Sequence, residues 1–196
     1  QMVAKGLDFE NVTLVGVADA DLGLYTDDFR ASERTFSLIT QVVGRAGRGN
    51  KKGRAVIQTY TPENDVLLCA SRQDYDSFYR EEIEIRRLMG CPPFRDLFVL
   101  TASGTSECNV LQACVRLRQG LEACLRLPEY QGVDVNVLGP APAAVAKVNN
   151  RFRYRLTVTG QNTRQLRGLI AHLLRAAHFD KQNKGVSVFA DVNPFN

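Results

Sequence analysis

The chain has 196 residues, of which 44% are hydrophobic and 23% charged, and its net charge is +4. This length suffices for one or two domains with a buried core, and this composition excludes a disordered or collagen-like chain. No apolar run reaches the roughly 20 residues of a membrane-spanning helix, so we expect no membrane partner. The five cysteines include no C-x-x-C pair, which predicts reduced thiols in a cytoplasmic protein. His172 and His178 are the only histidines and lie six residues apart, so the sequence offers no self-contained metal site.

The first part of the chain has the pattern of a parallel α/β sheet. Residues 12–18 form a near-continuous apolar run, typical of a strand buried on both faces. A helix is expected over 32–43 with Ser32 as its N-cap, and a second strand over 55–60. The apolar face of this helix holds Phe36, Ile39 and Val43. A strand, a helix and a strand in this order predict part of a parallel sheet.

A mainly helical stretch follows from 61 to about 89. The sequence Gly90-Cys91-Pro92-Pro93 ends it, because two prolines cannot continue a helix. We therefore expect three parts: an α/β part over 1–62, a helical linker segment over 63–94, and a C-terminal α+β domain over 95–196.

The last hundred residues predict strands and helices in a clear order. Strands are expected over 97–102, 133–138, 151–159 and 186–192, and helices over 106–127 and 163–178. Residues 139–142, Gly-Pro-Ala-Pro, are expected to form a loop. The order β-α-β-β-α-β is that of ferredoxin-like domains.

Basic residues are concentrated in two segments. Residues 44–54 hold five basic side chains and no acidic one, and residues 147–184 hold nine basic side chains against Asp180 alone. Such segments indicate contacts with a polyanion, with nucleic acid the leading candidate. The alternative for each is a solvated face.

The expected strand over 151–159 alternates strictly. Phe152 and Tyr154 point to one face, which we interpret as the core, and the side chains that point the other way are Arg151, Arg153 and Arg155. Alternate residues on a strand lie roughly 7 Å apart, so these arginines form a ladder on an open sheet face or edge. Three interpretations stay open: contact with a DNA backbone, a dock for an acidic protein tail, or a solvated face.

The sequence Gln41-Val42-Val43-Gly44-Arg45-Ala46-Gly47-Arg48 suits phosphate recognition. Guanidinium groups bind phosphate oxygens in pairs, and the glycines allow a ligand or backbone to approach closely. An arginine aimed at a γ-phosphate stabilises the charge of phosphoryl transfer. The alternative is a basic helix end that complements the helix dipole.

This string resembles motif VI of superfamily 2 helicases, and the opening QMVAKGLDF is similar to motif V. More narrowly, a series of segments resembles the PriA family of replication-restart helicases (primosomal protein N′). The segments are VTLVGVADADLGL, DFRASERTF, QVVGRAGRG, VIQTY, FYREEIEIRRLMGCPPF, LGPAPAAVAKVNNRFRYRL and DVNPFN. Together they cover essentially the whole chain.

The resemblance implies a fold and a function. Residues 1–62 would be the C-terminal part of a RecA-like helicase lobe 2 with motifs V and VI, followed by a basic DNA- or partner-binding domain. The activity implied is that of an ATP-dependent 3′-5′ DNA helicase that uses ATP and Mg and assembles primosomes at stalled forks and D-loops in the bacterial cytoplasm.

The chain departs from the whole family pattern in two ways. It has no Walker A sequence (G-x-x-x-x-G-K-[ST]) and no zinc cysteines, which the family carries upstream of motif V. We therefore expect a C-terminal fragment that does not hydrolyse ATP alone, with zinc in an upstream module. Leu7 also stands where the family often has histidine.

The resemblance assigns roles to individual residues. Arg48 would be the arginine finger, and Arg45 would contact the nucleotide phosphates or hold the geometry between lobes. The residues implied at the ATP site are Gln41, Gly44, Arg45, Arg48 and Asp8. Lys5 and Gly6 of motif V would contact the DNA backbone. For Arg151, Arg153 and Arg155, contact with DNA stays the first of the three interpretations given above.

The implied partners are single-stranded and forked DNA, single-stranded-DNA-binding protein and other primosome proteins. The acidic tail of single-stranded-DNA-binding protein would dock near Lys147, Arg164 and Arg167. Asp19 and Asp21 follow the first strand, where α/β sheets place their sites, or they are loop acids without a role. The alternative for the whole chain is a non-catalytic module that binds nucleic acid or protein tails.

Overall fold

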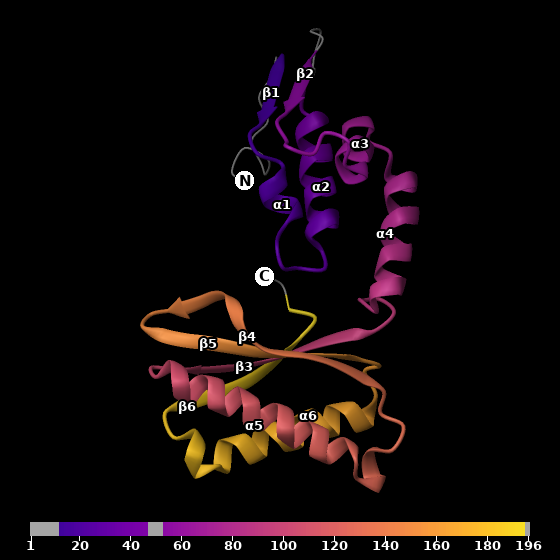
Figure 1. The fold of residues 1–196 in the computed structure, drawn as a ribbon. Helices are drawn as coiled ribbons and strands as arrows, with labels where there is room; N and C mark the ends of the chain where they lie inside the picture. Colours follow the sequence, from indigo (N-terminus) through magenta and orange to yellow (C-terminus); the bar gives the residue numbers. More distant parts are fainter. Residues whose placement is uncertain (1–11, 47–52, 195–196) are drawn as a thin grey trace. The chain divides into compact units, whose positions relative to one another are not determined.

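The computed structural model describes residues 12–46 and 53–194, which fall into two compact units, Gln1–Ile85 and Arg86–Asn196 (Figure 1). The division lies inside helix α4 (Tyr75–Met89), which belongs to the segment expected as a helical linker. The other helix of that segment is α3 (Asp65–Arg72).

The N-terminal unit contains a two-stranded parallel sheet. β1 (Leu14–Val17) pairs with β2 (Arg54–Ile57), and Val17 lies opposite Ile57. Helices α1 (Asp21–Leu24) and α2 (Ala31–Val43) lie between the two strands in sequence. The predicted order of strand, helix and parallel strand is confirmed.

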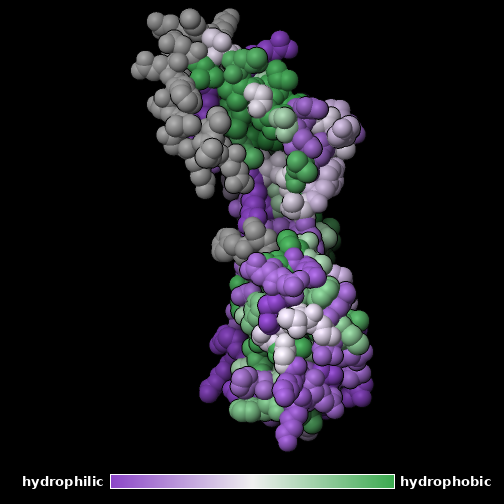
Figure 2. All heavy atoms as spheres, turned by 90° about the vertical axis from the view of Figure 1, so that its left-hand side faces the viewer, coloured by the Kyte–Doolittle hydropathy of each residue, from purple (hydrophilic) through white to green (hydrophobic). Residues whose placement is uncertain are grey.

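The prediction that the first strand is buried on both faces is wrong for the described residues. Leu14 on β1 is 63% exposed and Val56 on β2 is 46% exposed. The described part of this sheet has two strands only, and each alternates between exposed and partly buried positions. In the side view of Figure 2, the N-terminal unit accordingly shows a broad hydrophobic area in green.

The core of this unit lies among α2, α3 and α4. Phe36 of α2 stacks on Phe78 of α4, with ring centroids 4.2 Å apart, and Ile39 is 1% exposed. The predicted apolar face of α2 is confirmed. The predicted cap is wrong, because the helix begins at Ala31, one residue before Ser32, and the N-cap Arg30 makes no side-chain cap.

The C-terminal unit is a four-stranded antiparallel sheet with two long helices. Its strands are β3 (Asp96–Gly104), β4 (Val135–Val148), β5 (Arg151–Gly160) and β6 (Val186–Val192), and the helices are α5 (Glu107–Leu125) and α6 (Arg164–Phe179). The short 3₁₀ helices are η1 (Pro128–Tyr130) and η2 (Lys181–Asn183). The strand order is β4-β5-β3-β6, and the predicted β-α-β-β-α-β order is observed.

Both long helices cover the same face of this sheet (Figure 1). Strand residues Phe98, Leu100 and Leu156 face them and are at most 1% exposed. α6 contributes Leu166 and Leu169, both fully buried. Its first turn is capped by the Thr163 hydroxyl, which accepts a hydrogen bond from the Leu166 N–H at 3.1 Å. On β5, the side chains that point to the opposite sheet face belong to three arginines and two threonines, Arg151, Arg153, Arg155, Thr157 and Thr159.

The loop expected over 139–142 is instead part of β4. Proline is tolerated there because β4 is an edge strand, where a missing N–H breaks no ladder. The register shifts between Leu138 and Ala141 and again between Pro142 and Lys147. Gly139 has a φ of 102°, and a Cβ there would lie 2.8 Å from the Arg155 carbonyl oxygen, so the bulge requires glycine.

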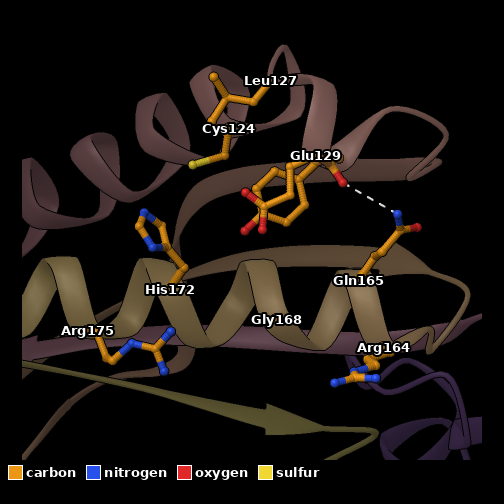
Figure 3. A pocket seen from close by; sticks show the side chains of 9 residues that line it. Cys124, Leu127, Glu129, Arg164, Gln165, Gly168, His172 and Arg175 are labelled. Carbon is orange, nitrogen blue, oxygen red and sulfur yellow. Dashed lines mark hydrogen bonds between the residues drawn. The ribbon is translucent and has the colours of Figure 1, made fainter.

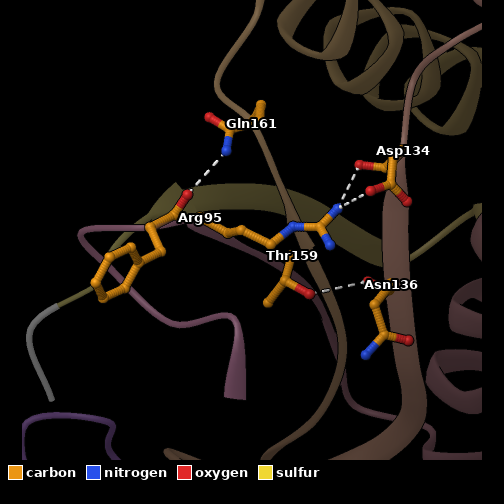
Figure 4. A network of polar contacts seen from close by, with 6 residues as sticks. Arg95, Asp134, Asn136, Thr159 and Gln161 are labelled. Carbon is orange, nitrogen blue, oxygen red and sulfur yellow. Dashed lines mark hydrogen bonds and ion pairs between the residues drawn. The ribbon is translucent and has the colours of Figure 1, made fainter. Parts of the chain in front are cut away.

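Polar contacts fix the segment that enters β3 (Figure 4). The Arg95 guanidinium donates to the backbone carbonyl and to the carboxylate of Asp134, both at 2.8 Å. The Gln161 side chain donates to the Phe94 carbonyl at 2.8 Å. The chain that leaves α4 is thereby tied to the starts of β4 and α6.

Candidate nucleic-acid interface

β5 divides its side chains between the two faces as its alternation predicts. Phe152 and Tyr154 pack against the helix-covered core, which confirms their interpretation as core residues. The Tyr154 hydroxyl donates to the Glu107 carboxylate at 2.9 Å, and this hydrogen bond is the main cause that raises the pKa of Tyr154. The three arginines lie on the open face, which α5 and α6 do not cover.

Arg151 is tied into the sheet. Its guanidinium donates to the Ser103 hydroxyl at 3.3 Å, to the Ser103 carbonyl at 2.8 Å and to the Ser187 hydroxyl at 2.8 Å. These contacts run from β5 across β3 to β6. The geometry therefore indicates that Arg151 braces the open face, with part of its donor capacity already used.

Arg153 and Arg155 lie further along the same face, and both are partly exposed. Arg153 is paired with Ser103, and Arg155 with Thr101, in the register of β3 and β5. Within residues 12–46 and 53–194, the Arg153 guanidinium makes no hydrogen bond or ion pair. It can offer all of its donors to an anion.

The sequence analysis did not single out Phe189, which lies on this face. It stands opposite Thr101 on β6 and is 41% exposed, while its neighbours Val188 and Ala190 pack on the core. The signal was present, because alternation along Val186–Val192 puts Phe189 with Ser187 and Asp191 rather than with the valines.

A pocket of about 460 Å³ lies beside α6, where α5 ends and η1 begins (Figure 3). Arg164, His172 and Arg175 approach it from α6. On the other side lie Tyr130, whose pKa is raised mainly by burial, and Glu129, whose carbonyl accepts a 3.4 Å hydrogen bond from Gln165. The pocket thus presents two arginines, a histidine and one carboxylate, that of Glu129, around a partly apolar floor.

The structure separates the three residues expected to hold an acidic tail. Lys147 lies opposite Phe152 near the β4–β5 turn, with its Nζ 4.6 Å from the Phe152 ring centroid. Arg164 follows the other end of β5, and eight strand residues span about 26 Å. Arg164 lines the pocket, whereas Arg167 donates to the carbonyl and side chain of Asn162 at 2.9 Å each.

The described part of the motif VI string ends helix α2. Gln41 and Gly44 are exposed and Arg45 is partly exposed, and the Arg45 N–H donates to the Val42 carbonyl at 3.1 Å. Gly44 has an ordinary helical φ of −66°, and a Cβ there would lie 3.3 Å from the Thr40 carbonyl oxygen and 3.5 Å from the Gln73 side chain. The backbone conformation at position 44 therefore does not require glycine. The predicted residues Lys5, Gly6, Asp8 and Arg48 lie outside the described residues.

Asp21, one of the two acids after β1, has a structural role. Its carboxylate accepts hydrogen bonds from the Tyr60 N–H at 2.9 Å and from the hydroxyls of Thr61 at 2.9 Å and Thr59 at 3.0 Å. The Tyr60 N–H is the main cause that lowers the pKa of Asp21. Asp21 therefore joins the segments that follow β1 and β2. Asp19 accepts one 3.3 Å bond from the Leu22 N–H.

Among residues 12–46 and 53–194, no three His, Cys, Asp or Glu side chains gather as metal ligands would. In the same ranges no helix has the length and apolar character to cross a membrane.

Comparison with known proteins supplies the family. Residues 87–195, which are more than half of the chain, match the family model of the primosomal protein N C-terminal domain. A solved structure of a designed protein, Foldit4, gives a TM-score of 0.35 at 15% identity over 52% of this chain and 99% of that one, which is too low to bear on the fold.

Curated relatives match most or all of the chain. The replication restart protein PriA of Bacillus subtilis is 37% identical over 195 residues, covering 100% of this chain and 24% of the relative. PriA of Rickettsia felis is 41% identical over 81% of this chain and 23% of its own length. PriA of Treponema pallidum is 36% identical over 100% of this chain and 28% of its own length. The chain thus spans about a quarter of the length of these relatives. It belongs to the PriA family of replication restart proteins and contains the C-terminal domain of that family.

Proposed function

We propose that the chain is the C-terminal part of an ATP-dependent 3′-5′ DNA helicase that restarts replication at stalled forks and D-loops. Its N-terminal unit would complete a RecA-like lobe 2 and supply motifs V and VI. Its C-terminal unit, a ferredoxin-like domain by strand order, would bind DNA. The family membership and the strand order β4-β5-β3-β6 support this assignment.

The ATP-site part of the proposal rests on the end of α2. Gln41 lies in the last turn of α2, which ends at Val43, and Arg45 follows the C-cap Gly44 in the turn just beyond the helix. The guanidinium of Arg45 fits phosphate oxygens chemically, and ATP supplies the bond whose hydrolysis drives the motor. Arg45, together with Arg48, would hold the negative charge that grows on the phosphates. Among the described residues, the end of α2 offers hydrogen-bond donors to phosphate oxygens and no cluster of carboxylates that could bind Mg.

The arginine face carries the DNA-binding part of the proposal. Arg153 and Arg155 project from the same side of β5, and the sheet face around them is not covered by α5 or α6. Arginine donors in a row suit successive phosphates of a nucleic-acid backbone. Lys5 and Gly6 of motif V would add backbone contacts from the N-terminal unit.

A partner site is proposed separately at the α6 pocket. The basic groups of Arg164, His172 and Arg175 suit carboxylates, and the burial of Tyr130 gives the pocket an apolar wall. The acidic tail of single-stranded-DNA-binding protein has this chemistry. Because Lys147 lies at the far end of the sheet, it would act in a different contact from Arg164.

The motor function is tested by DNA-stimulated ATP hydrolysis in the full-length protein. We expect Arg45→Ala and Arg48→Ala to lower kcat by at least tenfold, while Lys181→Ala, an exposed charge change in the other unit, leaves it unaltered. We expect Arg153→Ala/Arg155→Ala to raise the DNA concentration needed for half-maximal stimulation. The chain alone, which lacks a Walker A sequence, should show no turnover.

If the full-length protein neither hydrolyses ATP nor responds to DNA, the motor assignment is wrong. The chain would then be the alternative, a binding module for nucleic acid or protein tails.

A further inference from the structure

Phe189 is an exposed aromatic side chain on the same sheet face as the arginines. It lies on β6 and is 41% exposed. The residues of β6 that point to the other face pack on the core, and these are Val186, Val188 and Ala190. Across the sheet, the row runs Arg155, Thr101, Phe189, so the backbones of Arg155 and Phe189 are two strand spacings, about 10 Å, apart. Surfaces that bind single-stranded nucleic acid combine aromatic rings with arginines, and this open sheet face carries both.

The middle strand between them carries small side chains. Thr101 and Ser103 stand opposite Arg155 and Arg153 of β5 and are 4% and 9% exposed. No large side chain of β3 therefore stands between the arginines of β5 and the ring of Phe189. Arg151 closes one end of this area by bridging Ser103 and Ser187.

The charges on this surface determine how a nucleic-acid strand would lie across it. Arg153 and Arg155 lie on β5, whereas the acid on β6 is Asp191, two residues beyond Phe189 and opposite Val99. Phosphates are attracted toward β5 and repelled from the Asp191 end of β6. A backbone that follows β5 points its bases across β3 toward Phe189.

We infer that the open face of the β4-β5-β3-β6 sheet binds an unpaired DNA strand, with phosphates on Arg153 and Arg155 and a base stacked on Phe189. The ring can stack only on a base whose face is free, and in a duplex the neighbouring stacked base pairs cover the faces of each base. Phe189 therefore selects single strands over duplex. This inference rests on the proposed DNA binding by the arginine face and adds its preference for unpaired DNA.

The test is fluorescence anisotropy of the 196-residue chain with a labelled 20-nucleotide oligo(dT) and with a blunt 20-base-pair duplex. We expect Phe189→Leu to weaken binding of the single strand by about tenfold and to leave the duplex affinity unaltered, because leucine keeps apolar bulk without a π face. Phe189→Tyr should restore the affinity. Phe179→Leu, at the exposed end of α6, is the matched control and should have no effect.

A photo-crosslink provides a second reading. Oligo(dT) that carries one 5-iodouracil should crosslink to the peptide that contains Phe189, located by mass spectrometry. Full single-strand affinity in Phe189→Leu, or crosslinks only elsewhere, would overturn the inference.

The experiments distinguish the stacking site on Phe189 from the arginine interface. If Arg153→Ala/Arg155→Ala weakens binding but Phe189→Leu does not, the stacking site is wrong and the arginine interface stands. If the arginine variant binds as tightly as wild type, the interface itself is wrong, and the stacking inference falls with it.

Discussion

Three arginines that look equivalent in the alternation of β5 differ in what they contact. Arg151 makes three hydrogen bonds to β3 and β6, whereas Arg153 makes none with the described residues. We expect Arg151→Ala to lower the free energy of unfolding by about 1–3 kcal/mol and Arg153→Ala by less than about 0.5 kcal/mol. Urea denaturation followed by circular dichroism measures both. Equal losses would show that Arg151 does not brace the sheet.

Asp21 gives the N-terminal unit a pH dependence. Its hydrogen bonds lower the folded-state pKa below 3.8, so its stabilising contribution is present above about pH 4 and is lost as pH falls through the lowered value. We expect Asp21→Asn to have a lower Tm than wild type at pH 7 and a smaller further loss between pH 5 and pH 3. Thermal melts at these pH values measure the difference.

The control for Asp21 is Glu63→Gln, an exposed carboxyl two residues after Thr61, which donates a hydrogen bond to Asp21. Its Tm should follow that of wild type at every pH. If Asp21→Asn also follows wild type, the carboxylate does not join the ends of the two strands.

At this scale the sequence predicts which face a strand residue takes but not what it contacts. Alternation correctly put Phe152 and Tyr154 in the core. It could not show that Arg151 bridges two further strands, because that depends on the register of β3 and β6. The four motif residues Lys5, Gly6, Asp8 and Arg48 stay predictions.

At the scale of elements, periodicity predicts the long helices well. The stripe of α6 places Leu166, Leu169 and Leu173 at helical spacing, and all three are buried. The edge strand β4 was predicted only to 138, because a Gly-Pro-Ala-Pro run has the composition of a loop. Only the sheet's topology shows that this run lies at an edge, where proline is tolerated.

The α6 stripe yields a stability prediction. Leu169→Ala should lower the free energy of unfolding of the C-terminal unit by about 2–5 kcal/mol, because it removes a fully buried side chain. Phe179→Ala on the same helix, where the ring is 79% exposed, should cost less than about 1 kcal/mol. Chemical denaturation compares the two, and similar losses would contradict the packing of α6.

At the scale of the whole molecule, each unit has its own hydrophobic core, one among α2, α3 and α4 and the other between the antiparallel sheet and its helices. The fold class follows from the order of elements, but the division inside α4 does not, because helical periodicity continues through it. The chain covers about a quarter of the length of its relatives, so the proposed motor activity is tested in the full-length protein.

The measurement that tests the account most directly is the salt dependence of single-strand binding by the chain. If Arg153 and Arg155 each neutralise one phosphate, the slope of log Kd against log salt should fall by about 1.4 in Arg153→Ala/Arg155→Ala. Lys181→Ala/Lys184→Ala removes the same charge from exposed positions around η2 and should keep the wild-type slope. Equal slopes for wild type and the arginine variant would contradict a nucleic-acid interface on this face of the sheet.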